Sequence, residues 1–222
     1  MMTMKEAMKA RHMVRKYTNK PIPEEIIQSL NIRIAENNTK HHLAIQLNIN
    51  DTSAFNALIK LILAKGVHHY FVLAGPDVPD LDEKLGYCGA DLMLYAQTLG
   101  LNTWWVGGTF NRNKLNAEAG NNKVIGVIAV GYGVTQGTPH KTKKFEEVAV
   151  YNGDCPAWFK AGVEAALLAP TALNKQAFFI RGNHNHVKIT CDNGIFSGAD
   201  LGLVKYHFEL GAGTENFCWE KD

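Results

Sequence analysis

The segment Gly89-Ala90-Asp91-Leu92-Met93-Leu94 recurs 109 residues later as Gly198-Ala199-Asp200-Leu201-Gly202-Leu203, with five of the six positions identical. Each copy is expected to open a helix, is followed by a Leu-Gly pair, and precedes a predicted strand that contains tryptophan. Chance, or the preference for Asp near the positive end of a helix dipole, would also explain so short a match. We interpret the repeat as an internal duplication, in which the second half is a shortened copy of the first.

The hydrophobic pattern elsewhere predicts helices and strands in both halves of the chain. The expected helices cover residues 4–10, a segment that starts at 24, and residues 55–64, 80–99, 156–168 and 199–210. The expected strands cover residues 43–49, 69–74, 103–106, 123–131, 177–181 and 187–191. Residues 136–147 contain Gly, Pro, His and several lysines without an apolar period, which predicts a loop between the halves.

The composition is that of a folded domain without the excess of positive charge that would favour binding to a polyanion. Hydrophobic residues make up 46% of the 222 residues and charged residues 20%. A chain of this length buries roughly 70% of its extended surface on folding, so disorder is not expected. Because 23 Lys and Arg stand against 21 Asp and Glu, the net charge of +2 supplies no global field for a nucleic acid. No nucleic-acid partner is therefore expected.

The sequence has no pattern of a membrane span or a leader. Its longest uncharged window, residues 92–111, contains Gln97, Asn102, Thr103 and three glycines, so no membrane association is expected. Residues 1–15 lack an apolar core and a small-residue cleavage site, which predicts a cytoplasmic protein. The four cysteines are spaced 67, 36 and 27 residues apart and form no CxxC pair, so neither a disulfide framework nor a metal site is expected.

Two basic clusters suit an anionic ligand. The first is Arg11-His12-Met13-Val14-Arg15, after the first predicted helix, and the second is His140-Lys141-Thr142-Lys143-Lys144. Each alone is also explained by a solvated helix end or loop. A phosphate monoester, however, carries a charge of roughly −2 and three acceptor oxygens, and is held best by cations from separate segments. Together the clusters favour a small phosphorylated cofactor over a duplex.

Two further segments have the chemistry of a binding surface. Val106-Gly107-Gly108 ends a predicted strand, where the glycines let backbone N–H groups approach a flat ligand. Ala169-Pro170-Thr171-Ala172-Leu173-Asn174 offers a hydroxyl and an amide at a helix-to-strand junction. Ordinary turns would explain both. The chain contains no GxGxxG or GxxxxGK[ST] loop, and no Ser-His-Asp, GxSxG or HExxH signature.

These motifs, in this order, resemble the FMN-dependent nitroreductase family, and the whole chain is similar to its subgroup of internally duplicated nitroreductases. The segments that carry the resemblance are Arg11-His12-x-x-Arg15-x-Tyr17, Trp105-Val106-Gly107-Gly108, Val130-Gly131-Tyr132-Gly133, His140-Lys141-x-Lys143, Ala169-Pro170-Thr171-x-x-Asn174-x-Gln176 and Asp200-Leu201-Gly202-x-x-Lys205-Tyr206-His207-Phe208-Glu209. The combination is more specific than any one motif.

The resemblance implies an FMN site with no catalytic side chain, because the flavin carries the chemistry. The residues that it assigns to the FMN phosphate and ribityl chain are Arg11, His12, Met13, Arg15, Lys141 and Lys143. Those that it places beside the isoalloxazine are Val106, Gly107 and Gly108. A further set, Ala169, Pro170, Thr171 and Asn174, comes from the partner subunit in the family and occurs here only once, in the second half. Met13 stands where the family commonly has a serine, which removes one donor.

The resemblance also implies a fold and an assembly. The expected fold is α+β and nitroreductase-like, with a central, mostly antiparallel sheet flanked by helices. Residues 1–150 are expected to form the FMN-binding half, and residues 151–222 an abridged second repeat that completes the site. One chain would then be a pseudo-dimer with a single FMN site, and further homodimerisation is left open.

The implied activity is that of an FMN-dependent oxidoreductase. Hydride from NAD(P)H would pass through the flavin to a small-molecule acceptor, a nitroaromatic, a quinone or a similar compound, by a ping-pong mechanism. The main alternative is a flavin-binding protein with little turnover, for storage or sensing. A reductive dehalogenase, a flavin-fragmenting enzyme and a decayed site are further alternatives.

Overall fold

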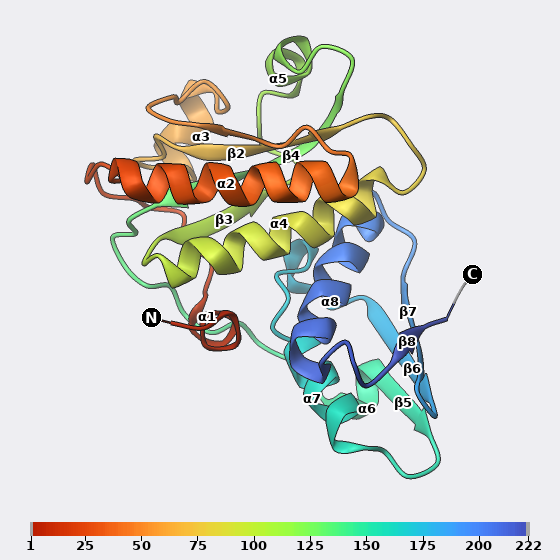
Figure 1. The fold of residues 1–222 in the computed structure, drawn as a ribbon. Helices are drawn as coiled ribbons and strands as arrows, with labels where there is room; N and C mark the ends of the chain where they lie inside the picture. The colour runs from red at the N-terminus through yellow and green to blue at the C-terminus, as the bar shows by residue number, and fades with distance from the viewer. Residues whose placement is uncertain (1, 221–222) are drawn as a thin grey trace.

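The computed structural model describes residues 2–220, which form two four-stranded sheets joined by a pair of crossing helices (Figure 1). The helices of the first part are α1 (Met4–Ala10), α2 (Glu24–His41), α3 (Ala57–Ile62), α4 (Leu81–Thr98) and α5 (Arg112–Glu118), and its strands are β1 (Gln46–Asn48), β2 (Tyr70–Gly75), β3 (Asn102–Val106) and β4 (Lys123–Gly131). The second part contains α6 (Phe145–Val148), β5 (Ala149–Asn152), α7 (Ala157–Ala166), the 3-10 turn η1 (Ala172–Asn174), β6 (Phe178–Asn183), β7 (His186–Cys191), α8 (Ser197–Ala212) and β8 (Cys218–Trp219).

The first sheet is antiparallel throughout, in the order β1-β2-β4-β3. Every residue of β2 is buried, because helices or loops cover both faces of the sheet. Alternate side chains of a strand point to opposite faces. Phe71 and Leu73 accordingly pack in one core with residues of α2 and α4, whereas Tyr70 and Val72 pack in another with Phe55 and residues near α3 and α5.

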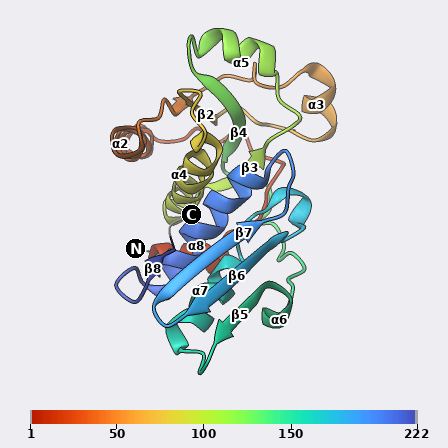
Figure 2. The same ribbon diagram turned by 90° about the vertical axis from the view of Figure 1, so that its right-hand side faces the viewer.

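The second sheet is mixed, in the order β5-β6-β7-β8. Its central pair is antiparallel, while β5 and β8 each run parallel to their neighbours. Helices α7 and α8 cover one face, and Figure 2 shows no helix over the other. Ile180 and Val187 are fully buried in a core that contains Phe159 of α7 and Phe208 of α8. This core is continuous with the α2 and α4 side of the first sheet, so the two parts share one hydrophobic interior.

Helices α4 and α8 cross in close contact between the two sheets (Figure 1). Glycines make the approach possible at two points. A Cβ atom on Gly86 would lie 2.1 Å from the carbonyl oxygen of Ala199, and one on Gly202 would lie 2.0 Å from that of Glu83. Both obstacles are backbone atoms, which cannot move without separating the helices. The crossing therefore requires glycine at these positions.

We expect Gly202→Ala to destabilise the fold by about 1 to 3 kcal/mol, the usual cost of overpacking a tight interior. The measurement is urea denaturation of the purified variant beside the wild type. Gly194→Ala is the matched control, because no atom lies within 4 Å of its added Cβ and its φ is not positive. Equal stability of the two variants would show that the α4–α8 crossing is looser than described.

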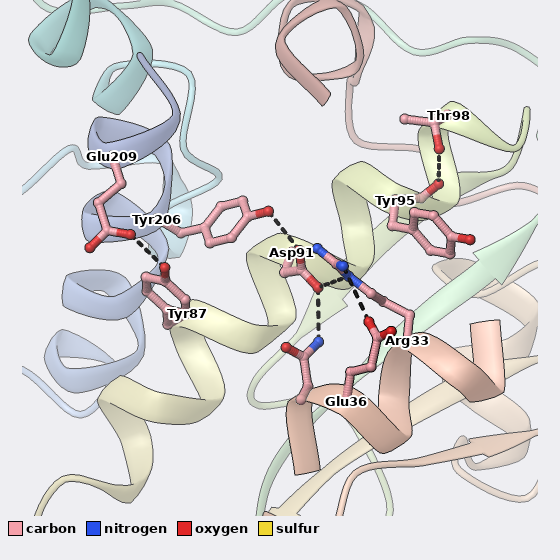
Figure 3. A network of polar contacts seen from close by, with 9 residues as sticks. Arg33, Glu36, Tyr87, Asp91, Tyr95, Thr98, Tyr206 and Glu209 are labelled. Atoms are coloured by element: carbon pink, nitrogen blue, oxygen red, sulfur yellow. Dashed lines mark hydrogen bonds and ion pairs between the residues drawn. The ribbon is translucent and has the colours of Figure 1, made fainter. Parts of the chain in front are cut away.

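A polar network ties three helices together beside this crossing (Figure 3). Asp91 of α4 is 2% exposed and accepts two hydrogen bonds from Arg33 of α2, at 2.7 and 2.6 Å. It also accepts from Asn37 Nδ2 at 2.8 Å and from the hydroxyl of Tyr206, on α8, at 2.6 Å. Hydrogen bonding to Asp91 raises the pKa of Arg33, so the guanidinium stays charged. A single buried carboxylate thus connects residues from both halves of the sequence.

The order of helices and strands expected from the sequence is confirmed, and so is the antiparallel sheet flanked by helices. Four short elements, α5, α6, β5 and β8, were not expected, and α6 forms at the end of the predicted 136–147 loop. The prediction that both repeat copies open a helix is wrong for the first. Gly89 lies inside α4, because the helix already begins at Leu81. The buried side chains of Leu81 and Leu85 start the apolar face of this helix before Gly89 is reached. The predicted boundary between residues 150 and 151 falls within β5.

Candidate functional site

Arg11 lies at the C-terminal end of α1, where its backbone N–H caps the helix by donating to the carbonyl of Ala7 at 2.8 Å. The helix packs mainly on α4 and α8 through Ala7 and Met8, and Arg11 at its end is 6% exposed. Burial lowers the pKa of Arg11 to about 10, so it is still a cation at neutral pH. Among the described residues its guanidinium has no hydrogen-bonding or carboxylate partner, and its Nε is buried and unpaired.

The chain beyond Arg11 continues along the edge strand of the first sheet. Met13 pairs with Thr103 of β3 in a parallel bridge, and the N–H of Val14 donates to the Thr103 carbonyl at 3.2 Å. The exposed guanidinium of Arg15 lies over the ring of Trp104, 5.3 Å from its centre. Met13 itself is 49% exposed. Because this segment runs along β3, alternate side chains of the first basic cluster point outward. Strand β3 itself ends at the glycine pair Gly107-Gly108.

The second basic cluster is fastened to the second half by Gln176, which is 1% exposed. Its Oε1 accepts from the backbone N–H of Lys143 at 2.7 Å, and its Nε2 donates to the Leu167 carbonyl at 3.0 Å. The ammonium of Lys143 donates to the Gln176 carbonyl at 2.9 Å. Asn174 Nδ2 donates to the Lys141 carbonyl at 2.8 Å. The Lys143 ammonium is therefore bound to the second half, whereas Lys141 contacts it through its backbone carbonyl and has an exposed side chain.

The segment that follows α7 has an unusual backbone. Leu173, Asn174 and Gln176 all have positive φ, at 52°, 54° and 48°. Residues other than glycine rarely adopt this conformation, and runs of it concentrate at functional sites. Thr171, which is buried, holds the turn closed by accepting from the N–H of Gln176 at 3.0 Å. Leu173 consequently projects outward and is 87% exposed.

The two basic clusters lie side by side. A Cβ atom on Gly137 would be 2.7 Å from Cβ of His12, so the loop before the second cluster touches the first. Burial lowers the pKa of His12, and the charges of Arg11 and His140 lower it further. His140 Nε2 lies 3.0 Å from the carbonyl oxygen of Leu167, at the end of α7. The two clusters are therefore neighbours, and the second of them contacts the end of α7 in the second half.

The glycine pair after β3 is covered by a side chain from the second half. A Cβ atom on Gly107 would lie 2.7 Å from the ring of Phe196, and one on Gly108 would lie 3.9 Å from it. Arg112 Nη2 donates to the Gly107 carbonyl at 3.2 Å from the other side. The absence of a side chain at Gly107 thus lets the aromatic ring of Phe196 lie directly against the backbone at the end of β3.

Asp200 connects this ring to the segment after α7. It stands one turn beyond Phe196 at the start of α8, and its carboxylate accepts from the N–H of Ala172 at 2.9 and 3.1 Å. Burial raises the pKa of Asp200 to about 6, although the bond from Ala172 acts in the opposite direction. The carboxylate therefore titrates in a range where most aspartates are fully charged.

We expect Asp200→Asn to stabilise the protein at pH 8 by about 1 to 2 kcal/mol, and to have little effect at pH 4. The folded pKa lies above that of an unfolded aspartate, so the stability contributed by Asp200 is full below pH 4 and is lost as pH rises through 6. Urea denaturation at pH 4, 6 and 8 measures the difference. Asp192→Asn, at an exposed neighbouring carboxylate, is the control. A gain that is the same at all three pH values would contradict the assignment.

Of the residues that the sequence assigned to the site, the glycine pair and the two lysines contact the second half, whereas Met13 and Arg15 lie along β3. Sequence reasoning gave no role to Phe196, Gln176 or Asp200, although the last two stand in matched motifs. Residues 192–196 have no helical or strand periodicity, so nothing in this stretch of sequence indicated that Phe196 would contact the glycine pair. An open hollow of about 370 Å³ is lined by Asn56, Phe110, Asn111, Arg112 and Asn113, and of these Arg112 donates to the Gly107 carbonyl.

Residues 2–220 contain neither a metal-binding cluster nor a membrane-spanning helix. No three His, Cys, Asp or Glu side chains in this range are grouped so as to hold a metal ion. No helix in the same range combines the length and apolar character needed to cross a membrane.

Comparison with known proteins assigns the chain to a family. The family described as "Putative TM nitroreductase" matches residues 3–212. The chain belongs to this nitroreductase family. No curated protein sequence matches it. A "putative nitroreductase" of Thermotoga maritima has the same fold, with a TM-score of 0.70 and 22% identity over 95% of this chain and 83% of that one.

Shorter members of the nitroreductase group match about two thirds of the chain. One, from Exiguobacterium sibiricum, was solved in complex with FMN and has a TM-score of 0.54 at 13% identity, covering 65% of this chain and 95% of that one. Another, from Bacteroides thetaiotaomicron and described as "NADH dehydrogenase/NAD(P)H nitroreductase", has a TM-score of 0.51 at 16% identity, covering 64% of this chain and 95% of that one. At these identities the likeness concerns the fold.

Proposed function

We propose that this nitroreductase-family protein is an FMN-dependent oxidoreductase, with one flavin site on the seam between its halves. The observation that carries the proposal is the buried Arg11, a cation without a carboxylate partner among the described residues, in the basic cluster whose His12 touches the loop before Lys141. Burying an unpaired charge is costly, and an anionic ligand removes that cost. The membership in the nitroreductase family and the FMN bound to a relative of the same fold point to FMN as the ligand.

The donors present suit the three parts of FMN. Arg11, Arg15 and Lys141 would hold the phosphate, with His12 and Met13 beside the ribityl chain. Val106, Gly107 and Gly108 would support one edge of the isoalloxazine through backbone groups. The segment that contains Ala169, Pro170, Thr171 and Asn174 would close the site from the second half. Lys143, whose ammonium already bonds the Gln176 carbonyl, would act by holding these segments together.

The chemistry that a bound FMN would supply is hydride acceptance from NAD(P)H and its delivery to a nitroaromatic, a quinone or a similar acceptor, in ping-pong order. The protein's own residues would bind and orient the ring and exclude water. Phe196 would limit access to the glycine pair, since its ring already lies against Gly107. We propose no essential acid or base side chain, and one chain as the functional unit, in which the second half replaces a partner subunit.

The test is anaerobic titration of FMN-loaded, desalted protein with NADH and, separately, NADPH, followed by the flavin absorbance bands. Bleaching by either nucleotide, and recovery on adding a quinone or a nitroaromatic, is the expected result. Bands that persist without bleaching would favour a flavin-binding protein for storage or sensing. A protein that retains no flavin would overturn the proposed function.

A further inference from the structure

Two buried polar atoms near the proposed phosphate site have no partner, and they are complementary. His207 of α8 is fully buried, and its Nδ1 lies 2.8 Å from the carbonyl oxygen of Leu203. A carbonyl only accepts, so Nδ1 carries the hydrogen and Nε2 of the neutral ring is left as an acceptor. That Nε2 is buried without a partner. Arg11 Nε, a donor by its chemistry, is likewise buried and unpaired.

The two residues face the same region from different halves of the chain. Arg11 directly follows α1, which packs on α4 and on α8, the helix that carries His207, through Ala7 and Met8. Burial, together with electrostatic interactions with Arg11 and His140, lowers the pKa of His207 to about 3, although the hydrogen bond to the Leu203 carbonyl acts in the opposite direction. These interactions place the Arg11 guanidinium near the ring. The imidazole is therefore neutral at physiological pH, and its bare nitrogen is a suitable acceptor beside a guanidinium.

An unsatisfied buried group costs about 1 to 3 kcal/mol, so two of opposite type, in residues that interact electrostatically, call for an explanation. One water molecule bridging a donor and an acceptor satisfies both at small entropic cost. Resting on the FMN site proposed above, we infer that His207 Nε2 accepts from Arg11 Nε–H through one buried water, and that His207 is the positioning residue of the phosphate-binding arginine.

This link would determine how Arg11 meets its ligand. The guanidinium is planar, with Nε on one side and the two terminal nitrogens forming a fork. Fixing Nε toward α8 leaves the fork to engage two oxygens of a phosphate, which is its strongest mode of binding. Of the nitrogens of Arg11, only Nε is buried without a partner. His207, in the second half, would thereby set the geometry of a cation in the first.

The test compares FMN with riboflavin, which lacks the phosphate. We expect His207→Phe, which keeps a buried ring but removes the acceptor, to raise the Kd for FMN about tenfold and to leave the Kd for riboflavin within about twofold. His207→Gln, which can place an amide oxygen near the position of Nε2, should recover most of the FMN affinity. A general packing defect would weaken both ligands equally, and that result, or no change in either, would overturn the inference.

A second measurement does not depend on flavin binding. In nitrogen-15 spectra of the flavin-free protein, the Nε–H signal of Arg11, assigned by its loss in Arg11→Lys, should be protected from solvent exchange. It should shift and exchange faster in His207→Phe. An Arg11 signal that is unchanged in that variant would overturn the link. Failure of the wild type to bind FMN, with the Arg11 signal coupled to His207, would refute the proposed cofactor and with it the phosphate-positioning role, while leaving the buried link established.

Discussion

Arg11→Leu is expected to raise the Kd for FMN at least about 100-fold and, at the same time, to make the flavin-free protein more stable. The loss of affinity follows because two charge-assisted hydrogen bonds to a phosphate each contribute about 1.5 to 3 kcal/mol. The gain in stability follows because leucine replaces a buried cation that has no carboxylate partner among the described residues, a change that commonly stabilises by about 1 to 4 kcal/mol. Opposite signs for binding and stability distinguish a ligand-binding residue from a structural one.

The measurements are flavin fluorescence titration and urea denaturation of the flavin-free protein. Lys16→Leu is the control, since Lys16 is an exposed cation of the same segment that has no assigned role in the site. It should change neither quantity by much. If Arg11→Leu instead destabilised the fold and bound FMN normally, Arg11 would be a structural cation, and the assignment of the phosphate site would be wrong.

Asp91→Leu is expected to destabilise the protein by about 3 to 5 kcal/mol, the cost of removing one partner of a buried ionic group. The substitution would leave Arg33, Asn37 and Tyr206 without their common acceptor (Figure 3). Because Tyr206 lies on α8, the loss should loosen the contact between the halves and reduce FMN binding as well. Denaturation midpoints and FMN titration measure the two effects.

Glu36→Leu provides a matched comparison for this network. Glu36 forms an ion pair with the same Arg33 at 3.3 Å, but its side chain is 60% exposed. An exposed pair contributes about 0 to 1 kcal/mol. A cost for Asp91→Leu no larger than that of Glu36→Leu would show that the network does not hold the helices together.

The sequence predicted the long elements well because each has a strong local signal. Helices α4 and α8 have sustained apolar faces, and β2 is an uninterrupted apolar run. The elements it missed are short and depend on tertiary partners. Strand β5 has four residues and β8 has two, and each forms only by pairing in parallel with a strand of the second sheet. Strands this short are not long enough to produce an alternating hydrophobic pattern in the sequence.

The candidate site was predictable as a set of cations and turns, but its geometry was not. Arg11 and Lys141 belong to recognisable basic clusters, whereas nothing in the local sequence distinguishes the buried Arg11 from the exposed Arg15. The repeat also concealed a difference. Asp91 and Asp200 occupy matching positions of the sequence repeat, yet the buried Asp91 binds the partly exposed Arg33 and Asp200 caps the Ala172 amide. Which donors reach each carboxylate depends on the segments that fold against it.

The central claim is that one chain holds one FMN between its two halves, and native mass spectrometry of the reconstituted protein tests it most directly. The expected spectrum shows single chains that each carry one FMN, with the flavin lost in Arg11→Leu and retained in Lys16→Leu. A flavin found only on species of two chains, or single chains that carry none, would contradict the account.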